Sequence, residues 1–260
     1  MTIFYRCDDP EEFRNSSHYR RTIEDDRRDA AEARTQLWHY TNLEVLFKIA
    51  ANKTIRFSRI DCVNDLLEKK LLMVENMYLG TYIACFNHDV KESIPLWSMY
   101  TSKGRGVRIG FEFNDDNVQN SFIGIDSKCV SSDNPIQLSE YRPYIHDIEY
   151  SDEMTVLPIT QVDGDVLVSP RDIAFEKTTI WEYEKETRIM MFNPNRRDDN
   201  SPDYIDFLLD FRKLKALVIT FDPWMTDEIK QSIRLTVQYY LKEYVDILDF
   251  QNSELEGKIR

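Results

Sequence analysis

The chain has 260 residues, 42% of them hydrophobic, and its 14 Tyr and 14 Phe supply enough large apolar side chains for a core, which excludes a disordered chain. Its 33 Lys and Arg are outnumbered by 46 Asp and Glu, and the resulting net charge of −13 repels nucleic-acid phosphates and anionic membrane surfaces. Bulk nucleic-acid binding is therefore not expected.

The first 36 residues carry dense charge of both signs. Within them, residues 22–36 (TIEDDRRDAAEARTQ) combine good helix formers with little apolar face. No Pro, Gly or Ser run divides the rest of the chain into two. We therefore predict a charged, exposed helical extension over 1–36 and a single α+β domain over 37–260.

The first half of this domain mixes short strands and helices. Thr41 and Glu44 form a T-x-x-E capping box, which predicts a helix with Leu46 and Ala50 on its apolar face. In 106–113, apolar residues alternate with Arg, Gly and Glu, as in a strand with one buried face. The other strands expected here are 37–40, 55–60 and 81–86, and the other helices are 65–79 and 95–102.

The second half begins with a polar, turn-rich stretch over 114–140, for which we predict a long surface loop. Ser169, Pro170 and Asp172 are typical of a helix start, so a helix is expected over 170–184. The remaining predicted elements are strands at 141–150, 187–192, 207–211, 215–221 and 245–250 and a helix at 226–243. This mixed order favours an α+β fold with flanking helices over a doubly wound sheet.

Several kinds of site are excluded by what the sequence lacks. The four cysteines are widely spaced, form no C-x-x-C pair and have no His at metal-ligand spacing, so neither a metal site nor a disulfide framework is expected. Glycine-rich phosphate-loop motifs are absent. No apolar run approaches the ~20 residues of a membrane span, and no targeting signal precedes the domain. We expect a cytoplasmic protein.

Four segments in this order resemble the domain-of-unknown-function family 2971. They are LWHYTNLEVLFKI with IRFS, then NDLLE, then ACFN with PLWSMYTSKGRGVRIGFEF, and finally FEKTTIWEYEKETRIMMF. The resemblance covers residues 37 to 250. Because the name of the family describes no activity, the same segments were compared with a second fold.

The order of the segments is also similar, remotely, to ADP-ribosyltransferases of the diphtheria-toxin and poly(ADP-ribose) polymerase type. That similarity implies a mostly antiparallel, split sheet and NAD as the substrate. It implies that Glu186 stabilises the oxocarbenium-like transition state of NAD cleavage and that Tyr100 stacks on the nicotinamide. His39 would bond the adenosine-side ribose, and Thr41 would support the nicotinamide end.

Further residues complete the candidate site. If 184–188 is extended, Glu184 and Glu186 share a strand face and divide the catalytic roles, although Arg188 on the same face offers the alternative of a simple surface ion pair. The other candidate NAD-binding residues are Tyr40, Ser58, Asn64 and Trp97. Tyr40 stands where the compared enzymes have Gly, and each of these residues also has an ordinary structural explanation.

Two functions therefore stay open. The first is an ADP-ribosyltransferase-like or NAD-cleaving enzyme that acts on a nucleotide and an unidentified acceptor, as part of bacterial phage defence or as a toxin-like protein. The second is a non-catalytic module that binds a small ligand or a protein in the same cleft. A Ser hydrolase has little support, because no G-x-S-x-G elbow is present.

Overall fold

The structure is a computed structural model. It describes residues 30–63, 77–115, 118–122, 141–152, 160–162, 165–167, 174–193 and 201–259. Its strands are β1 (Gln36–Asn42), β2 (Thr54–Arg59), β3 (Thr81–Asn87), β4 (Gly106–Phe113), β5 (Arg142–Asp147), β6 (Glu149–Tyr150), β7 (Thr160–Val162), β8 (Asp165–Leu167), β9 (Glu176–Lys177), β10 (Glu186–Phe192), β11 (Tyr204–Leu208), β12 (Leu214–Phe221) and β13 (Leu248–Asn252). The α-helices that lie wholly within the described residues are α2 (Leu43–Asn52), α4 (Ile94–Tyr100) and α6 (Asp227–Tyr240).

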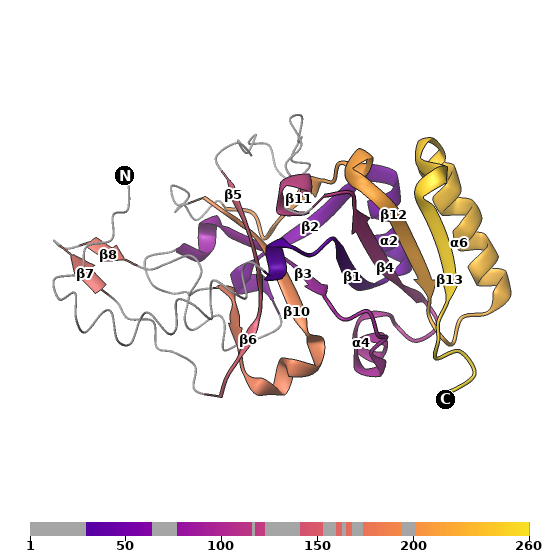
Figure 1. Ribbon diagram of the computed structural model, residues 1–260, viewed down its shortest axis with the longest axis horizontal. Coiled ribbons are helices and arrows are strands. Elements are labelled where there is room, and N and C mark those ends of the chain that lie inside the picture. Colours follow the sequence, from indigo (N-terminus) through magenta and orange to yellow (C-terminus); the bar gives the residue numbers. More distant parts are fainter. Residues whose placement is uncertain are drawn as a thin grey trace.

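Nine of these strands form one sheet (Figure 1). Seven follow the order β11-β2-β3-β1-β4-β12-β13, and β10 and β5 join through β3. The paired strands of this sheet run antiparallel, with the exception of the parallel pair β12 and β13. The α+β class and the mostly antiparallel sheet predicted from the sequence are confirmed.

The sheet is divided at one edge of β3. Along its other edge, β3 pairs with β10 from Thr81 to Asn87 without interruption. On the divided edge, Tyr82 and Ile83 pair with β2, and the register with β1 is the single pair Trp38 and Asn87. A sheet with such a gap offers room between its two halves, and the candidate site lies there.

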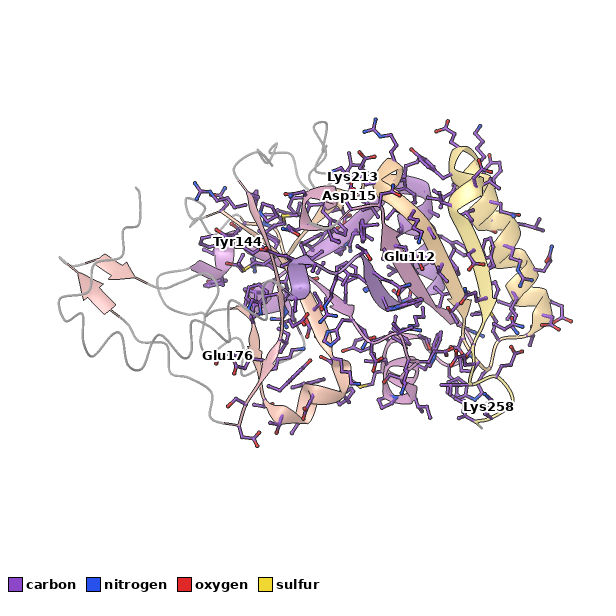
Figure 2. All side chains as sticks on the ribbon, viewed as in Figure 1. Glu112, Asp115, Tyr144, Glu176, Lys213 and Lys258 are labelled. Carbon is purple, nitrogen blue, oxygen red and sulfur yellow. The ribbon has the colours of Figure 1, made fainter. Side chains whose placement is uncertain are left out.

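The main apolar core covers one face of the sheet. On β4, Val107, Ile109 and Phe111 are buried in it, together with residues of α2 and α6. Each such side chain contributes roughly 1.5–3 kcal/mol by leaving water. Glu112 alternates with these residues on β4 (Figure 2). It accepts a hydrogen bond from Gln36 at 2.8 Å. The strand predicted over 106–113 and its apolar core face are confirmed, but the prediction of a single buried face is wrong, because Arg108 and Gly110 on the other face are buried as well.

The opposite face carries α4. Tyr40 of β1 packs there with Leu96 and Trp97 of α4 in a separate apolar cluster. The rings of Tyr40 and Trp97 meet edge to face, with centroids 5.0 Å apart. This packing holds α4, and with it Tyr100, against the first strand.

Gly110 gives Trp38 its place on this face. The two residues are register partners on β4 and β1, and a Cβ built on Gly110 would lie 2.5 Å from the Trp38 ring. We expect Gly110→Ala to lower the free energy of unfolding by about 1–3 kcal/mol, because the indole must shift. Urea unfolding measures this, and Trp38→Leu should remove most of the penalty in a double-mutant cycle. Purely additive effects would contradict this explanation.

The boundaries of several elements differ from the prediction. The helix after β1 is capped by Asn42, whose side chain accepts from the Val45 amide at 3.0 Å, whereas Thr41 remains in the strand as the register partner of Val107. Asn and Thr are both favourable N-cap residues. Because Thr41 still pairs within the strand, the helix begins one residue later and Asn42 caps it. The strand expected at 207–211 is β11, that at 245–250 is β13, and that at 141–150 divides into β5 and β6.

The helix predicted over 170–184 is wrong in its described part, except at Ala174, which is helical. Residues 176 and 177 form β9, which pairs in parallel with β6, and Thr179–Glu184 is a 3-10 helix. Tertiary contacts outweigh helix propensity in this segment. The helix predicted over 65–79 and most of the loop over 114–140 lie outside the described residues, except for Met77–Gly80 and Val118–Phe122, which are short 3-10 helices.

The described end of the predicted N-terminal extension contacts the domain. Ala31 is buried in the main core, contrary to the exposure expected for it, and Arg34 forms an ion pair with Asp147 of β5. The division of the chain at residue 36 stays a prediction. No helix among the described residues is long and apolar enough to cross a membrane.

Candidate functional site

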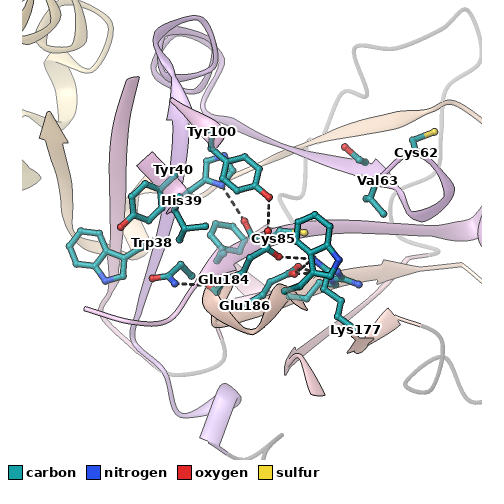
Figure 3. Close-up of a pocket in the computed structure, with 16 residues that line it drawn as sticks. Trp38, His39, Tyr40, Cys62, Val63, Cys85, Tyr100, Lys177, Glu184 and Glu186 are labelled. Atoms are coloured by element: carbon teal, nitrogen blue, oxygen red, sulfur yellow. Dashed lines mark hydrogen bonds and ion pairs between the residues drawn. The ribbon is translucent and has the colours of Figure 1, made fainter. Parts of the chain in front are cut away.

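A cavity of about 250 Å³ opens beside the gap between β1 and β3 (Figure 3). It is lined by Trp38, His39, Tyr40, Ser58, Cys62, Val63, Cys85, Phe86, Asn87, Leu96, Tyr100, Lys177, Trp181, Glu184, Glu186 and Arg188. These residues come from β1, β2, the 3-10 helix Ile60–Cys62 with the following Val63, β3, α4, β9, the 3-10 helix Thr179–Glu184 and β10. Segments far apart in the sequence therefore supply one site.

Six of the nine predicted site residues line this cavity, two do not, and one lies outside the described residues. The six are His39, Tyr40, Ser58, Tyr100, Glu184 and Glu186. Thr41 is buried within β1 and Trp97 lies behind Tyr40, so neither reaches the cavity. Asn64 lies outside the described residues.

Glu184 and Glu186 are brought together by a turn and not by a shared strand face. Glu184 ends the 3-10 helix, Lys185 has a left-handed backbone with φ 42°, and Glu186 begins β10. Between the two carboxylates lies the ammonium of Lys177, whose Nζ is 2.7 Å from Glu184 and 2.6 Å from Glu186. One buried cation thus joins both predicted acids.

Arg188 is the second cation of this group. Its Nε and a terminal nitrogen donate to the two carboxylate oxygens of Glu186, at 2.8 and 3.3 Å. It also donates to the Ala174 carbonyl. The side chain is only 1% exposed, so the surface ion pair considered from the sequence is in fact a buried one.

The electrostatics keep Glu186 ionised. Burial alone would raise the pKa of its carboxyl, but the charges of Arg188 and Lys177 outweigh burial and hold the pKa well below its usual range. The same attraction, above all to Glu186, overcomes the effect of burial on Lys177 and raises the pKa of its ammonium. Burial, followed by the nearby charge of Glu186, raises the pKa of the Cys85 thiol well above normal. At neutral pH the site holds a carboxylate, an ammonium and an uncharged thiol.

Tyr100 reaches the same group from α4. Its hydroxyl donates to Glu184 at 2.6 Å, and burial together with this bond raises the pKa of the phenol. The Tyr100 ring thereby has a fixed position on the wall of the cavity, with its hydroxyl directed at Glu184 (Figure 3).

His39 joins the two halves of the sheet. Its Nδ1 is 3.2 Å from the Cys85 carbonyl, across the edge of β3 that lacks ladder pairing. A carbonyl only accepts, so Nδ1 carries the proton and Nε2 is the acceptor of the ring. Burial lowers the pKa of His39, so the imidazole is neutral.

The loop before α4 and the turn after it are held by two buried or half-buried carboxylates. Glu92 accepts from the Trp97 indole at 2.8 Å and from the Glu254 amide at 2.7 Å. Asp222, which is fully buried, accepts from the Thr101 hydroxyl at 2.8 Å and from the Gly104 amide at 2.9 Å. The position of Tyr100 is therefore fixed from both ends of its helix.

Ten of the sixteen lining residues were not predicted as site residues, among them Lys177, Cys85 and Trp181, and Arg188 was not predicted in its buried role. Only the two cations could have been expected from the sequence, because two acidic side chains two residues apart in a predicted buried strand need positive charge beside them. Nothing in the pattern indicated which Lys would supply it. Among the residues that the structure describes, no group of three or more His, Cys, Asp or Glu could hold a metal ion.

Residues 96–189 match the model of a family described as "Protein of unknown function (DUF2971)". This match supports the resemblance to that family, and the matched stretch contains Tyr100, Lys177, Glu184, Glu186 and Arg188. Comparison with curated proteins and with solved structures found no match. The chemistry must therefore be argued from the cavity itself.

Proposed function

We propose that the cavity binds NAD and breaks the bond between nicotinamide and ribose, which would make the protein an ADP-ribosyltransferase-like or NAD-cleaving enzyme. The observation that carries this proposal is the meeting of His39, Tyr100 and Glu186 in one cavity, from three distant segments. An ADP-ribosyltransferase-like site would require these three residues to share one cavity. The gap between β1 and β3 also fits the split sheet that the similarity to those enzymes implies.

The proposed reaction follows the physical chemistry of glycoside cleavage. The bond between the ribose carbon and the pyridinium nitrogen breaks, and its electron pair leaves with neutral nicotinamide. The positive charge that grows on the sugar is stabilised by the carboxylate of Glu186, which burial keeps in surroundings of low dielectric. Water or an acceptor then attacks the sugar carbon, and Glu184 accepts the proton of that nucleophile.

The other lining residues have binding roles in this proposal. The ring of Tyr100 stacks on the nicotinamide, a contact worth about 0.5–1.5 kcal/mol beyond area burial. Its hydroxyl already bonds Glu184, so the ring is positioned before the ligand enters. Nε2 of the neutral His39 accepts a hydrogen bond from a ribose hydroxyl.

The direct test is release of nicotinamide from NAD. We expect the purified full chain, incubated with NAD and cell extract, to release nicotinamide above the rate of a sample without protein, as followed by chromatography. Extract provides acceptors, and its omission separates transfer from hydrolysis. A rate equal to the blank under both conditions would rule the enzymatic proposal out.

A second candidate function is a non-catalytic module that binds a small ligand. It is favoured by one observation, that Lys177 and Arg188 both neutralise Glu186 and so weaken the negative potential available to a sugar cation. Thermal shift separates the two candidates. A ligand at 100 times its dissociation constant stabilises the fold by about 2.7 kcal/mol, and such a shift without turnover would favour binding alone.

The biological setting that we propose is the bacterial cytoplasm, in phage defence or as a toxin-like protein. The motive is the resemblance to the family and the NAD chemistry proposed for Glu186. Expression of the wild-type chain in bacteria should then lower cellular NAD, and expression of Glu186→Gln should not. Equal NAD levels in both cultures would remove the support for this setting.

A further inference from the structure

The charges of the cavity are matched within the cavity. Among its described lining residues the cations are Lys177 and Arg188, and the anions are Glu184 and Glu186. Lys177 bonds both carboxylates and Arg188 bonds Glu186, all at 2.6–2.8 Å in their shortest contacts. His39 and Cys85 add no charge at neutral pH, because burial lowers the pKa of the imidazole and raises that of the thiol.

A phosphate group finds no partner in such a cavity. To bind there it would have to take Lys177 or Arg188 away from a carboxylate, and it would leave that carboxylate buried without compensation. The two carboxylates also repel it, as does the net charge of −13 on the whole chain. Phosphate binding inside the cavity is therefore strongly disfavoured.

The walls suit a ring and a sugar. Trp38, Tyr40, Tyr100 and Trp181 provide aromatic surface, and Glu184 with Glu186 provides the acceptors. The volume of about 250 Å³ lies just below the range of about 300–1,000 Å³ that is usual for ligand pockets. A complete dinucleotide does not fit this volume, whereas its pyridinium ring and the adjoining ribose do.

We infer that the cavity recognises a phosphate-free pyridinium nucleoside, and that the phosphates and the adenosine of NAD remain outside it. The choice of a pyridinium ring rests on the proposed function. The ring carries the positive charge of the nucleoside and meets the aromatic faces of the cavity wall, which attract a cation. His39 then bonds the ribose attached to the pyridinium, and not the adenosine-side ribose that the resemblance implies.

Isothermal titration of the full chain with three ligands tests this inference. Nicotinamide riboside carries the nucleoside alone, ADP-ribose carries the phosphates without the pyridinium, and NAD carries both. We expect the dissociation constant of nicotinamide riboside to lie within about tenfold of that of NAD, and that of ADP-ribose to be at least about tenfold weaker. ADP-ribose that binds as tightly as NAD, or nicotinamide riboside that does not bind, overturns the inference.

A pair of variants makes the test specific to the cavity. Glu184→Gln releases Lys177 from one of its two carboxylates, so the preference for nicotinamide riboside over ADP-ribose should fall by about tenfold. Glu44→Gln, which removes an exposed carboxylate that pairs with Lys48 on α2, should leave the preference unchanged. An equal change in both variants, or none in Glu184→Gln, counts against the inference.

Release of nicotinamide, followed in the same samples, distinguishes this inference from the proposed function. Binding of nicotinamide riboside without any release supports the inference and refutes NAD cleavage. Cleavage of NAD without binding of nicotinamide riboside refutes the inference and supports NAD cleavage.

Discussion

Glu186→Gln is expected to slow the release of nicotinamide from NAD on the order of 10²-fold or more, the loss seen when one preorganised charge-stabilising group is removed. The amide keeps the size of the side chain and removes its charge. In the wild-type chain that charge is present at any pH near neutrality, because Arg188 and Lys177 hold the pKa of Glu186 well below normal. The measurement is the rate of nicotinamide release at saturating NAD.

The control for this prediction must separate charge from folding. Glu186 is buried, so Glu186→Gln also leaves Arg188 and Lys177 with less compensation and destabilises the fold. Assays therefore run at a temperature where near-ultraviolet circular dichroism shows the variant to be folded. Glu44→Gln, which removes an exposed carboxylate on α2, should keep the full rate. A folded Glu186→Gln protein with wild-type turnover would refute the catalytic role of Glu186.

The elements that were predicted well are those whose pattern is local. In β4 the alternation of apolar and polar residues predicts the strand and its core face, and the structure buries Val107, Ile109 and Phe111 in the main core. The other face, with Arg108 and Gly110, is buried as well, which the local pattern does not reveal. The short helix with Tyr100 was predicted from Pro95 near its start, and α4 indeed contains Pro95 in its first turn. Such signals need no knowledge of distant contacts.

The centre of the site depends on distant contacts and could not be predicted in full. Lys177 lies in a segment rich in helix formers, yet the structure pairs it with Tyr150 in the short parallel ladder of β6 and β9. That ladder places its ammonium between two carboxylates seven and nine residues away. The pairing of Glu184 and Glu186 was predicted for the wrong reason, because a left-handed Lys185 and not strand alternation brings them together.

Lys177→Met is expected to lower the free energy of unfolding by about 3–5 kcal/mol at pH 7, because it leaves two buried carboxylates without their common cation. The chain offers a matched control in Lys48→Met. Lys48 and Glu44 lie 2.6 Å apart, the same separation as Lys177 and Glu186, but both are exposed. Its loss should change stability by no more than about 0.5 kcal/mol. Urea unfolding measures both, and equal losses would show that burial does not set the strength of the pair.

The pH dependence of the stability of Lys177→Met tests whether the lost charge causes the loss of stability. Glu186 has a lowered pKa in the folded chain, so its stabilisation is present above its ordinary pKa of 4.5 and is lost as the pH falls below that value. Lys177 has a raised pKa, so its stabilisation is present below 10.5 and is lost at higher pH. Without Lys177 the carboxylate of Glu186 loses one of its two cations and protonates more readily, so acid should destabilise the variant less steeply than the wild type. The two stability curves should therefore converge as the pH falls from 7 to 3, whereas parallel curves would assign the effect of Lys177 to the packing of its methylene groups.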